Sequence, residues 1–185
     1  GADATVYESR FSNSRGGTGD AKHAGALMVQ AAGNCLVFDS VFEDAYSEGD
    51  GGSVAVIGGS NAEFIRTTFR RSEAQQWGGI AAIKEESTAL FLQCELKNGA
   101  AGFGGGIYVA TACVVNVTRC TFAYGHVTGH SGAISNYGDL FIQDSTFEHS
   151  ETETYGGDVH SSAGSHSEIV RTVFAGARAA SYGGS

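Results

Sequence analysis

Asp158 and His160 are the residues of this sequence that most resemble a general acid–base pair. They lie two residues apart, and alternate residues of a β-strand share one face of the sheet. We therefore expect the carboxylate and the imidazole to point outward together. His130 precedes the glycine of the neighbouring coil, and Tyr108 lies two coils away in the same column as His160. Groups of these types abstract and return a proton beside a sugar carboxylate, so a polysaccharide lyase or epimerase is the catalytic alternative.

Three features of the sequence weigh against catalysis. No clustered Asp pair is present, of the kind that a glycosidase needs. No basic residue is evidently placed to neutralise a uronate carboxylate. The predicted turns are short and nearly uniform, so long loops that would wall a cleft are missing. We therefore expect no enzymatic activity and assign no catalytic residue outside that alternative.

A column of mostly aromatic residues recurs two positions before a repeated glycine and is the main candidate for binding. Its members are His23, Asp50, Trp77, Phe103, His130, Tyr155 and Tyr182. In register these side chains would form a ladder of rings along one corner. Such a ladder can stiffen the turn through ring stacking. It can also contact a protein partner or stack against the faces of a glycan, since Trp and Tyr are enriched in interface cores.

The cysteines do not predict a metal site. Cys35, Cys94, Cys113 and Cys120 include no C-x-x-C pair, so we expect neither zinc nor a cofactor. Cys94 and Cys120 occupy equivalent positions of adjacent repeats, where a disulfide is geometrically allowed and two buried free thiols are favoured. Asn116 opens an Asn-Val-Thr glycosylation sequon, which adds modest weight to an extracellular or cell-surface location.

Charge and hydropathy exclude some partners. The formal net charge is −9, with Lys+Arg 11 against Asp+Glu 20. Nucleic acids and anionic membranes both attract basic surfaces, so neither is an expected partner. No apolar run is long enough for a membrane-spanning helix, and direct insertion is not expected.

Two landmarks repeat along the whole chain and predict the elements that position these residues. A pair of small residues recurs every 25–27 residues, and its second members open coils near Gly25, Gly52, Gly79, Gly105, Gly132, Gly157 and Gly184. A large apolar residue follows in each coil: Phe11, Phe42, Phe69, Leu96, Phe122, Phe147 and Phe174. The first interval is longer because of an insertion within Ser14–Asp20. Periods of this length are typical of solenoids, and about seven coils are expected.

Each period contains short segments that alternate with period two, which is the pattern of β-strands. One inward column is large: Val6, Val37, Phe64, Phe91, Val117, Ile142 and Ile169. A second inward column is small: Ser9, Ser40, Thr67, Cys94, Cys120, Ser145 and Thr172. After the glycine pair, outward positions are expected at Met28, Ala55, Ala82, Tyr108, Ser135 and His160. The prediction is an all-β, right-handed parallel β-helix formed by residues 1–185 as one domain.

A column of charged and polar residues precedes each large apolar landmark by three positions. Its members are Glu8, Asp39, Arg66, Gln93, Arg119, Asp144 and Arg171. Mixed signs in adjacent coils predict exposed cross-strand ion pairs that help to set the register.

The repeat resembles those of polymorphic outer-membrane proteins and related extracellular β-helix passenger domains or algal and protist surface proteins. The resemblance rests on Gly104-Gly105-Gly106-Ile107-Tyr108 followed by Cys120-Thr121-Phe122. Those repeats typically carry Asn three residues after the Phe, whereas this chain has Ser, Ala or Gly there. The resemblance implies adhesion and surface architecture and brings no catalytic residues with it.

We therefore expect a structural or adhesive segment of a longer extracellular protein. Neither end shows a polar cap, so further coils or other subunits are the expected partners at the open ends. The alternatives are a carbohydrate-active β-helix and a glycan-binding module.

Overall fold

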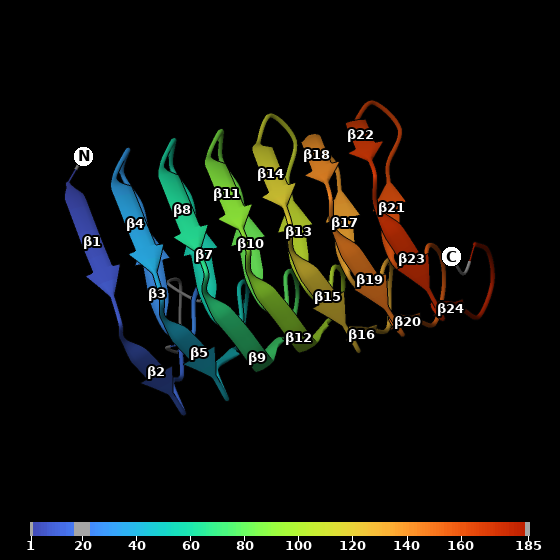
Figure 1. The fold of residues 1–185 in the computed structure, drawn as a ribbon, viewed down its shortest axis with the longest axis horizontal. Helices are drawn as coiled ribbons and strands as arrows, with labels where there is room; N and C mark the ends of the chain where they lie inside the picture. Colours follow the sequence, from blue (N-terminus) through green and yellow to red (C-terminus); the bar gives the residue numbers. More distant parts are fainter. Residues whose placement is uncertain (1, 17–22, 184–185) are drawn as a thin grey trace.

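The protein is built from three parallel β-sheets that run along one rod. The computed structural model describes residues 2–16 and 23–183. Strands from successive turns lie side by side from the N-terminal to the C-terminal end (Figure 1). The seven-stranded sheet contains β1 (Asp3–Tyr7), β4 (Asn34–Phe38), β8 (Asn61–Ile65), β11 (Thr88–Leu92), β14 (Val114–Thr118), β18 (Asp139–Gln143) and β22 (His166–Val170). The six-stranded sheet contains β3 (Leu27–Val29), β7 (Val54–Val56), β10 (Ala81–Ile83), β13 (Ile107–Val109), β17 (Ile134–Asn136) and β21 (Val159–Ser161).

The third sheet carries the large apolar landmarks and four short side strands. Its main path contains β2 (Arg10–Ser12), β5 (Val41–Glu43), β9 (Thr68–Ala74), β12 (Glu95–Ala101), β15 (Thr121–Ala123), β19 (Thr146–Glu148) and β23 (Val173–Ala175). The side strands are β6 (Tyr46–Ser47), β16 (His126–Val127), β20 (Glu151–Thr152) and β24 (Arg178–Ala179). Within the described ranges, no helix is long and apolar enough to cross a membrane.

The strands complete about six turns, one fewer than the seven coils expected. The difference arises because β1 and β2 belong to a partial turn that has no strand in the six-stranded sheet. All six described coil openings are followed by a strand of that sheet two residues later. Gly184 and residues 17–20 of the Ser14–Asp20 insertion lie outside the described residues.

The predicted columns coincide with the observed register. Phe42 pairs with Phe11 and with Phe69, and Phe122 pairs with Leu96 and with Phe147. All recorded strand pairs are parallel, as stacked coils require. The repeat spacing therefore predicted both the fold class and the neighbours of each strand.

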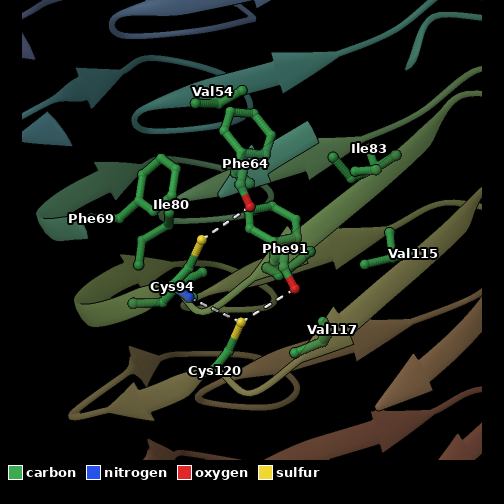
Figure 2. Close-up of a cluster of buried hydrophobic side chains, with 14 of the residues drawn as sticks. Val54, Phe64, Phe69, Ile80, Ile83, Phe91, Cys94, Val115, Val117 and Cys120 are labelled. Carbon is green, nitrogen blue, oxygen red and sulfur yellow. Dashed lines mark hydrogen bonds between the residues drawn. The ribbon is translucent and has the colours of Figure 1, made fainter. Parts of the chain in front are cut away.

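The core is a set of side-chain stacks inside the rod. Phe42, Phe64, Phe69 and Phe91 are fully buried, and Figure 2 shows several of these rings with the valines and isoleucines that surround them. The Phe42 and Phe69 rings are stacked 5.0 Å apart, and Phe64 and Phe91 are stacked 4.9 Å apart. Phe69 also meets Phe64 edge-on at 5.5 Å. The two Phe stacks thus join two sheets across the interior.

The small inward column satisfies its own polar atoms. Ser145 Oγ donates to the carbonyl of Gln143 at 2.8 Å and accepts from the amide of Cys120 at 3.1 Å. Ser40 Oγ donates to the carbonyl of Phe38 at 2.9 Å and accepts from the amide of Ser9 at 3.1 Å. These bonds explain why hydroxyl groups are tolerated in the core, since a buried polar group without a partner is destabilising.

Two left-handed residues per coil bend the chain on either side of the strands that carry the apolar landmark. Asp39 and Asp44 flank Phe42 with φ values of 51° and 54°. Arg66 and Arg71 flank Phe69 in the same way, with φ values of 47° and 53°. The charged column coincides with the first of these two positions. Its side chains leave the corner and form the predicted ion pairs, including Arg66 with Asp39 at 2.7 Å.

The Asp144–Arg171 pair in this column yields a titration prediction. Arg171 Nε and Nη2 donate to Asp144 at 2.5 and 3.0 Å, and this hydrogen bonding lowers the pKa of Asp144 to about 2. We expect an Arg171→Gln substitution to return the pKa toward its ordinary value of 3.8, because the cation that favours the carboxylate is lost. Carboxyl carbon NMR titration of Asp144 measures this shift directly. An unchanged titration midpoint would show that the hydrogen bond from Gln143, the second cause of the low pKa, controls the Asp144 carboxyl.

One predicted column differs from the structure. Ala55, Ala82 and Ser135 were expected at outward positions and are fully buried. Tyr108 pairs with Ala82, and His160 pairs with Ser135, in adjacent strands of the six-stranded sheet. These large neighbours stack against further rings, so a layer of side chains covers the outer face of the sheet.

Candidate functional site

Asp158 lies inside the rod, so the expectation that it points outward with His160 is wrong. It follows Gly157 as Ile80 follows Gly79 and as Ala133 follows Gly132, and these equivalent residues belong to the core. Its exposed fraction is 2%, and neither carboxylate oxygen has a hydrogen-bond partner. β21 begins only at Val159, so the alternation of a strand does not extend to Asp158.

The other three catalytic candidates lie on the outer face of the six-stranded sheet. The rings of His130 and His160 are stacked 4.7 Å apart. Burial, followed by the charge of His130, lowers the pKa of His160. Tyr108 is half-buried, and burial raises its pKa to about 12. Since Asp158 is buried in the core, the structure does not bring together the carboxylate–imidazole pair that the catalytic alternative requires.

An ionic cluster forms the N-terminal part of the aromatic corner. His23 Nδ1 lies 3.2 Å from Asp50 Oδ2, and Lys84 Nζ donates to the same oxygen at 2.7 Å. Lys84 Nζ also lies 4.4 Å from the centre of the Trp77 ring, which is a cation–π distance. Asp50 is therefore buried beneath a cation that also contacts the first large ring of the column.

The middle of the corner combines two columns. The Trp77 ring stacks on Tyr108 at 5.6 Å, Tyr108 meets Tyr137 at 5.5 Å, and Tyr137 meets His160 at 6.1 Å. Lys84 reaches back to Asp50 of the preceding coil, whereas Tyr108 comes from the following coil. The Trp77 ring thus contacts both a cation and a phenol ring.

The C-terminal part continues the same arrangement. His130 lies 5.2 Å from Phe103 and 5.0 Å from Tyr155, and Tyr155 stacks on Tyr182 at 5.5 Å with the rings nearly parallel. We call the residues from His23 to Tyr182 that make these contacts the ring stack: His23, Asp50, Trp77, Lys84, Phe103, Tyr108, His130, Tyr137, Tyr155, His160 and Tyr182. Its rings pack mainly on one another, as expected for a stacking ladder, and the stiffening role stays a prediction.

Comparison with known proteins agrees with this geometry. A family model described as a right-handed beta helix region matches residues 1–174. The chain belongs to this family. A comparison with the curated proteins gives no match.

Membership of the right-handed β-helix family settles the fold and leaves the activity open. Domains of this family occur in enzymes of the pectin lyase type and in proteins without catalytic activity. The family therefore supports a structural or carbohydrate-active β-helix in general. The finer resemblance to polymorphic outer-membrane proteins stays a prediction.

The cysteines of this β-helix are free and buried. Cys94 Sγ donates to the carbonyl of Phe64 at 3.2 Å, and Cys120 Sγ donates to that of Phe91 at 3.3 Å (Figure 2). Burial raises the pKa of Cys35 and of Cys113. Across residues 2–16 and 23–183, no group of three or more His, Cys, Asp or Glu side chains could hold a metal ion.

We expect a thiol reagent to label the cysteines only after unfolding. All four side chains are buried, and a thiolate, which is the reactive form, is disfavoured in an apolar interior. Ellman titration should detect almost no thiol in the native protein and all four in denaturant. Two missing thiols in the denatured, unreduced protein would instead reveal a disulfide.

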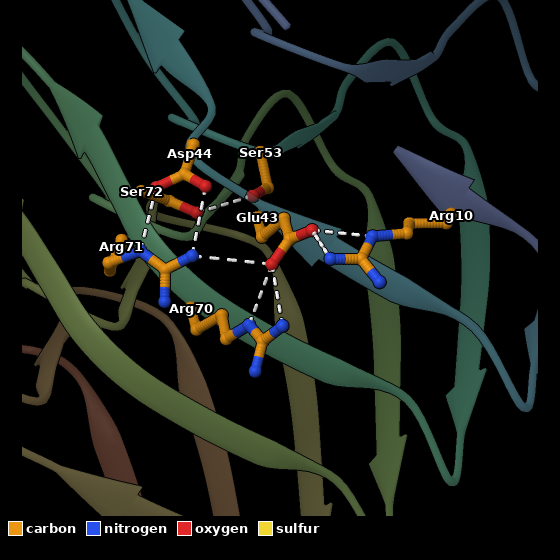
Figure 3. Close-up of polar contacts among 7 residues, drawn as sticks. All are labelled: Arg10, Glu43, Asp44, Ser53, Arg70, Arg71 and Ser72. Atoms are coloured by element: carbon orange, nitrogen blue, oxygen red, sulfur yellow. Dashed lines mark hydrogen bonds and ion pairs between the residues drawn. The ribbon is translucent and has the colours of Figure 1, made fainter. Parts of the chain in front are cut away.

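Sequence reasoning missed a buried acidic residue that is surrounded by arginines. Glu43 is 3% exposed and accepts from Arg10, Arg70 and Arg71, with Arg70 Nη2 at 2.6 Å (Figure 3). Arg71 also forms a two-bond pair with Asp44 at 2.7 and 2.9 Å. Hydrogen bonding from Arg70 is the main cause that lowers the pKa of Glu43. The available signal was the opposite charge of Glu43 and Arg70, which are direct neighbours in the register, and the cluster is a structural one.

A second missed feature is a surface hollow of about 390 Å³ beside β16 and β20. Tyr124 and His149 stack 5.5 Å apart at its wall. A side chain at Gly176 would contact the His149 ring at 2.6 Å, so this glycine leaves room for the imidazole. The lining residues are Tyr124, Gly125, His126, His149, Glu151, Gly176 and Arg178. Two imidazoles, one carboxylate and one guanidinium could bind a small polar ligand there.

Proposed function

We propose that this β-helix is a structural segment of an extracellular or cell-surface assembly and acts through lateral or end-on protein contacts. The observation that carries this proposal is the ring stack. It links the coil of His23 to the coil of Tyr182 along one side of the rod by stacked rings and an ion cluster. A solenoid repeat contacts only its neighbours, so a continuous outer stack opposes bending between them. A stiff rod is suited to an architectural role.

The outer part of the ring stack also supplies a contact surface. Tyr155 is 41% exposed and Tyr182 is 70% exposed. Large amphipathic rings favour protein interfaces because they bury apolar area and retain a polar edge. We therefore assign lateral contacts to this corner.

Electron microscopy of the native material tests the proposal. Density for further subunits on the Trp77–Tyr182 corner or against the coil edges is the expected result. Isolated rods without neighbours would contradict it. In the assembled protein, Tyr155→Ala with Tyr182→Ala should weaken assembly, whereas Tyr124→Ala should not, because Tyr124 is comparably exposed at 54% but follows β15, away from the ring stack and from the end strands.

Asn116 is the proposed attachment site for a glycan. Its side chain is exposed on β14, where its strand neighbours are Leu90 and Phe141. A glycan at this position would cover the outer face of the seven-stranded sheet and leave the ring stack free. Mass spectrometry of the peptide that contains Asn116, from native material, tests both the modification and the extracellular location.

The alternative function is carbohydrate-active or glycan-binding. The outward groups of His160, His130 and Tyr108 favour it, whereas the buried position of Asp158 removes its carboxylate partner. Depolymerisation assays on acidic polysaccharides discriminate the two proposals. We expect no turnover, and product formation that His160→Ala abolishes would replace the structural proposal with the catalytic one.

A further inference from the structure

The coil that opens at Gly157 carries a charge-bearing group at a core position. The residue after the glycine pair is Ser53, Ile80, Gly106 or Ala133 in the coils of β7, β10, β13 and β17. Asp158 occupies the same place before β21. Ser53 is satisfied there by a 2.6 Å hydrogen bond with Ser72, whereas both carboxylate oxygens of Asp158 lack a partner. An ionised carboxylate at this site is therefore poorly solvated.

The groups that face Asp158 do not compensate for its burial. Ser150 is equivalent to Ser72, but its Oγ is also buried and without a hydrogen-bond partner. Burial is the largest influence on the Asp158 carboxyl and raises its pKa to about 6. Ser150 and the charge of His149 lower that pKa, but by less. The neutral carboxylic acid is thus the form that suits the packed coil.

His160, on β21 itself, places an opposing group on the outer face of the sheet, whereas Asp158 precedes the strand and lies in the core. The His160 ring stacks on His130 at 4.7 Å and lies 6.1 Å from Tyr137, and its buried Nδ1 has no partner. Protonation would place a charge on a partly buried imidazole that stacks on a second imidazole. The packed coil therefore suits a neutral imidazole as well as a neutral acid.

We propose that the coil around β21 is a pH-responsive element, which packs tightly while Asp158 is a neutral acid and opens locally more often once the carboxyl ionises. The proposal is independent of the structural function and concerns this coil alone. It makes the rod adjustable at one place, since the equivalent positions before β7, β10, β13 and β17 carry Ser, Ile, Gly and Ala, which have no charge to gain.

The direction of the effect follows from linkage. The pKa of Asp158 is raised in the folded state from 3.8 to about 6, so its contribution to stability is complete below pH 3.8 and is lost as the pH rises through 6. His160 acts oppositely, because its lowered pKa makes stability fall as the pH drops through the ordinary value of 6.5. The two groups partly cancel in the parent protein and must be separated by substitution.

Hydrogen exchange of the whole chain at pH 5 and pH 7.5 provides the test. The variant is Asp158→Ala, which copies Ala133 at the equivalent position and is therefore expected to fold. For the amides of β21, corrected for intrinsic exchange, the ratio of protection at pH 5 to that at pH 7.5 should be about tenfold larger in the parent than in the variant. The comparison cancels the ionisable groups that are common to both proteins and do not interact with Asp158.

Two further measurements keep the test decisive. His160→Tyr, which copies Tyr108, should increase the pH 5 to pH 7.5 ratio because it removes the opposing group. The amides of β10 should show no difference between parent and Asp158→Ala, since β10 lies three strands from β21 in the sheet. Equal ratios at β21 in parent and Asp158→Ala, or an equal change at β10, would overturn the proposal.

Discussion

A Phe69→Ala variant is expected to lose about 3–5 kcal/mol of unfolding free energy, the range measured for Phe truncation in packed cores. Phe69 is fully buried, and its ring contacts Phe42, Phe64 and Phe91 at 5.0, 5.5 and 6.2 Å between centroids. Its removal leaves a cavity in the middle of both ring columns. Rigid strands on each side cannot collapse into the space without losing their own pairing. Urea unfolding followed by circular dichroism measures the loss.

Phe174→Ala is the matched control for this prediction. Phe174 occupies the same column and stacks on Phe147 at 4.9 Å, but it is only partly buried and belongs to the last strand of the column. Less apolar area returns to water on its truncation, so the loss should be clearly smaller. Equal losses at the two positions would contradict a core organised as neighbour-to-neighbour stacks.

The sequence was sufficient for the columns because parallel stacking converts the repeat length into spatial register. Residues 26 or 27 apart, such as Phe69 and Leu96, are direct neighbours in the structure. The inward alternation of Val54 and Val56 was predictable for the same reason, since it falls within β7. Period and alternation are local properties that a single sequence displays.

The candidate site was less predictable because it depends on where each strand begins and on which side chains interleave. Asp158 and His160 are two residues apart, but β21 includes only the second, so their directions differ. Tyr137 joined the ring stack although it belongs to neither predicted column. Contacts between different columns have no period of their own, and the repeat therefore does not reveal them.

The left-handed corners were also invisible in the sequence. Glycine is the usual residue at positive φ, but Asp39, Arg66 and Asp144 adopt it here with φ between 47° and 51°. The cost of this conformation is offset where the corner amides bond to the neighbouring coil, as the amide of Arg66 does with the carbonyl of Leu92 at 2.9 Å. The ion pairs of the charged column then lie where the chain already bends.

A Gly52→Ala variant is expected to be destabilised by at least about 3 kcal/mol, because the added carbon meets backbone that cannot move alone. A Cβ at Gly52 would lie 2.0 Å from the carbonyl oxygen of Gly79 and 2.7 Å from the backbone of Glu73. Gly79 opens the next coil, and the amide of Gly52 already donates to the carbonyl of Gly78 at 3.1 Å, so relief requires two coils to separate. The second member of the pair is thus glycine because the neighbouring backbone leaves no room for a Cβ.

Gly59→Ala separates this effect from conformational strain. Gly59 has φ of +68°, yet a Cβ there meets nothing within 4 Å. Ala31 and Ala32 already adopt φ of 58° and 55° in the equivalent turn of the preceding coil, so the fold accepts alanine in this conformation. The loss at Gly59 should be about 1–2 kcal/mol, the cost of a left-handed alanine. Thermal and urea unfolding of both variants measures the two losses of unfolding free energy. A larger loss for Gly59→Ala than for Gly52→Ala would mean that backbone conformation selects glycine in this solenoid, and not the close approach of successive coils.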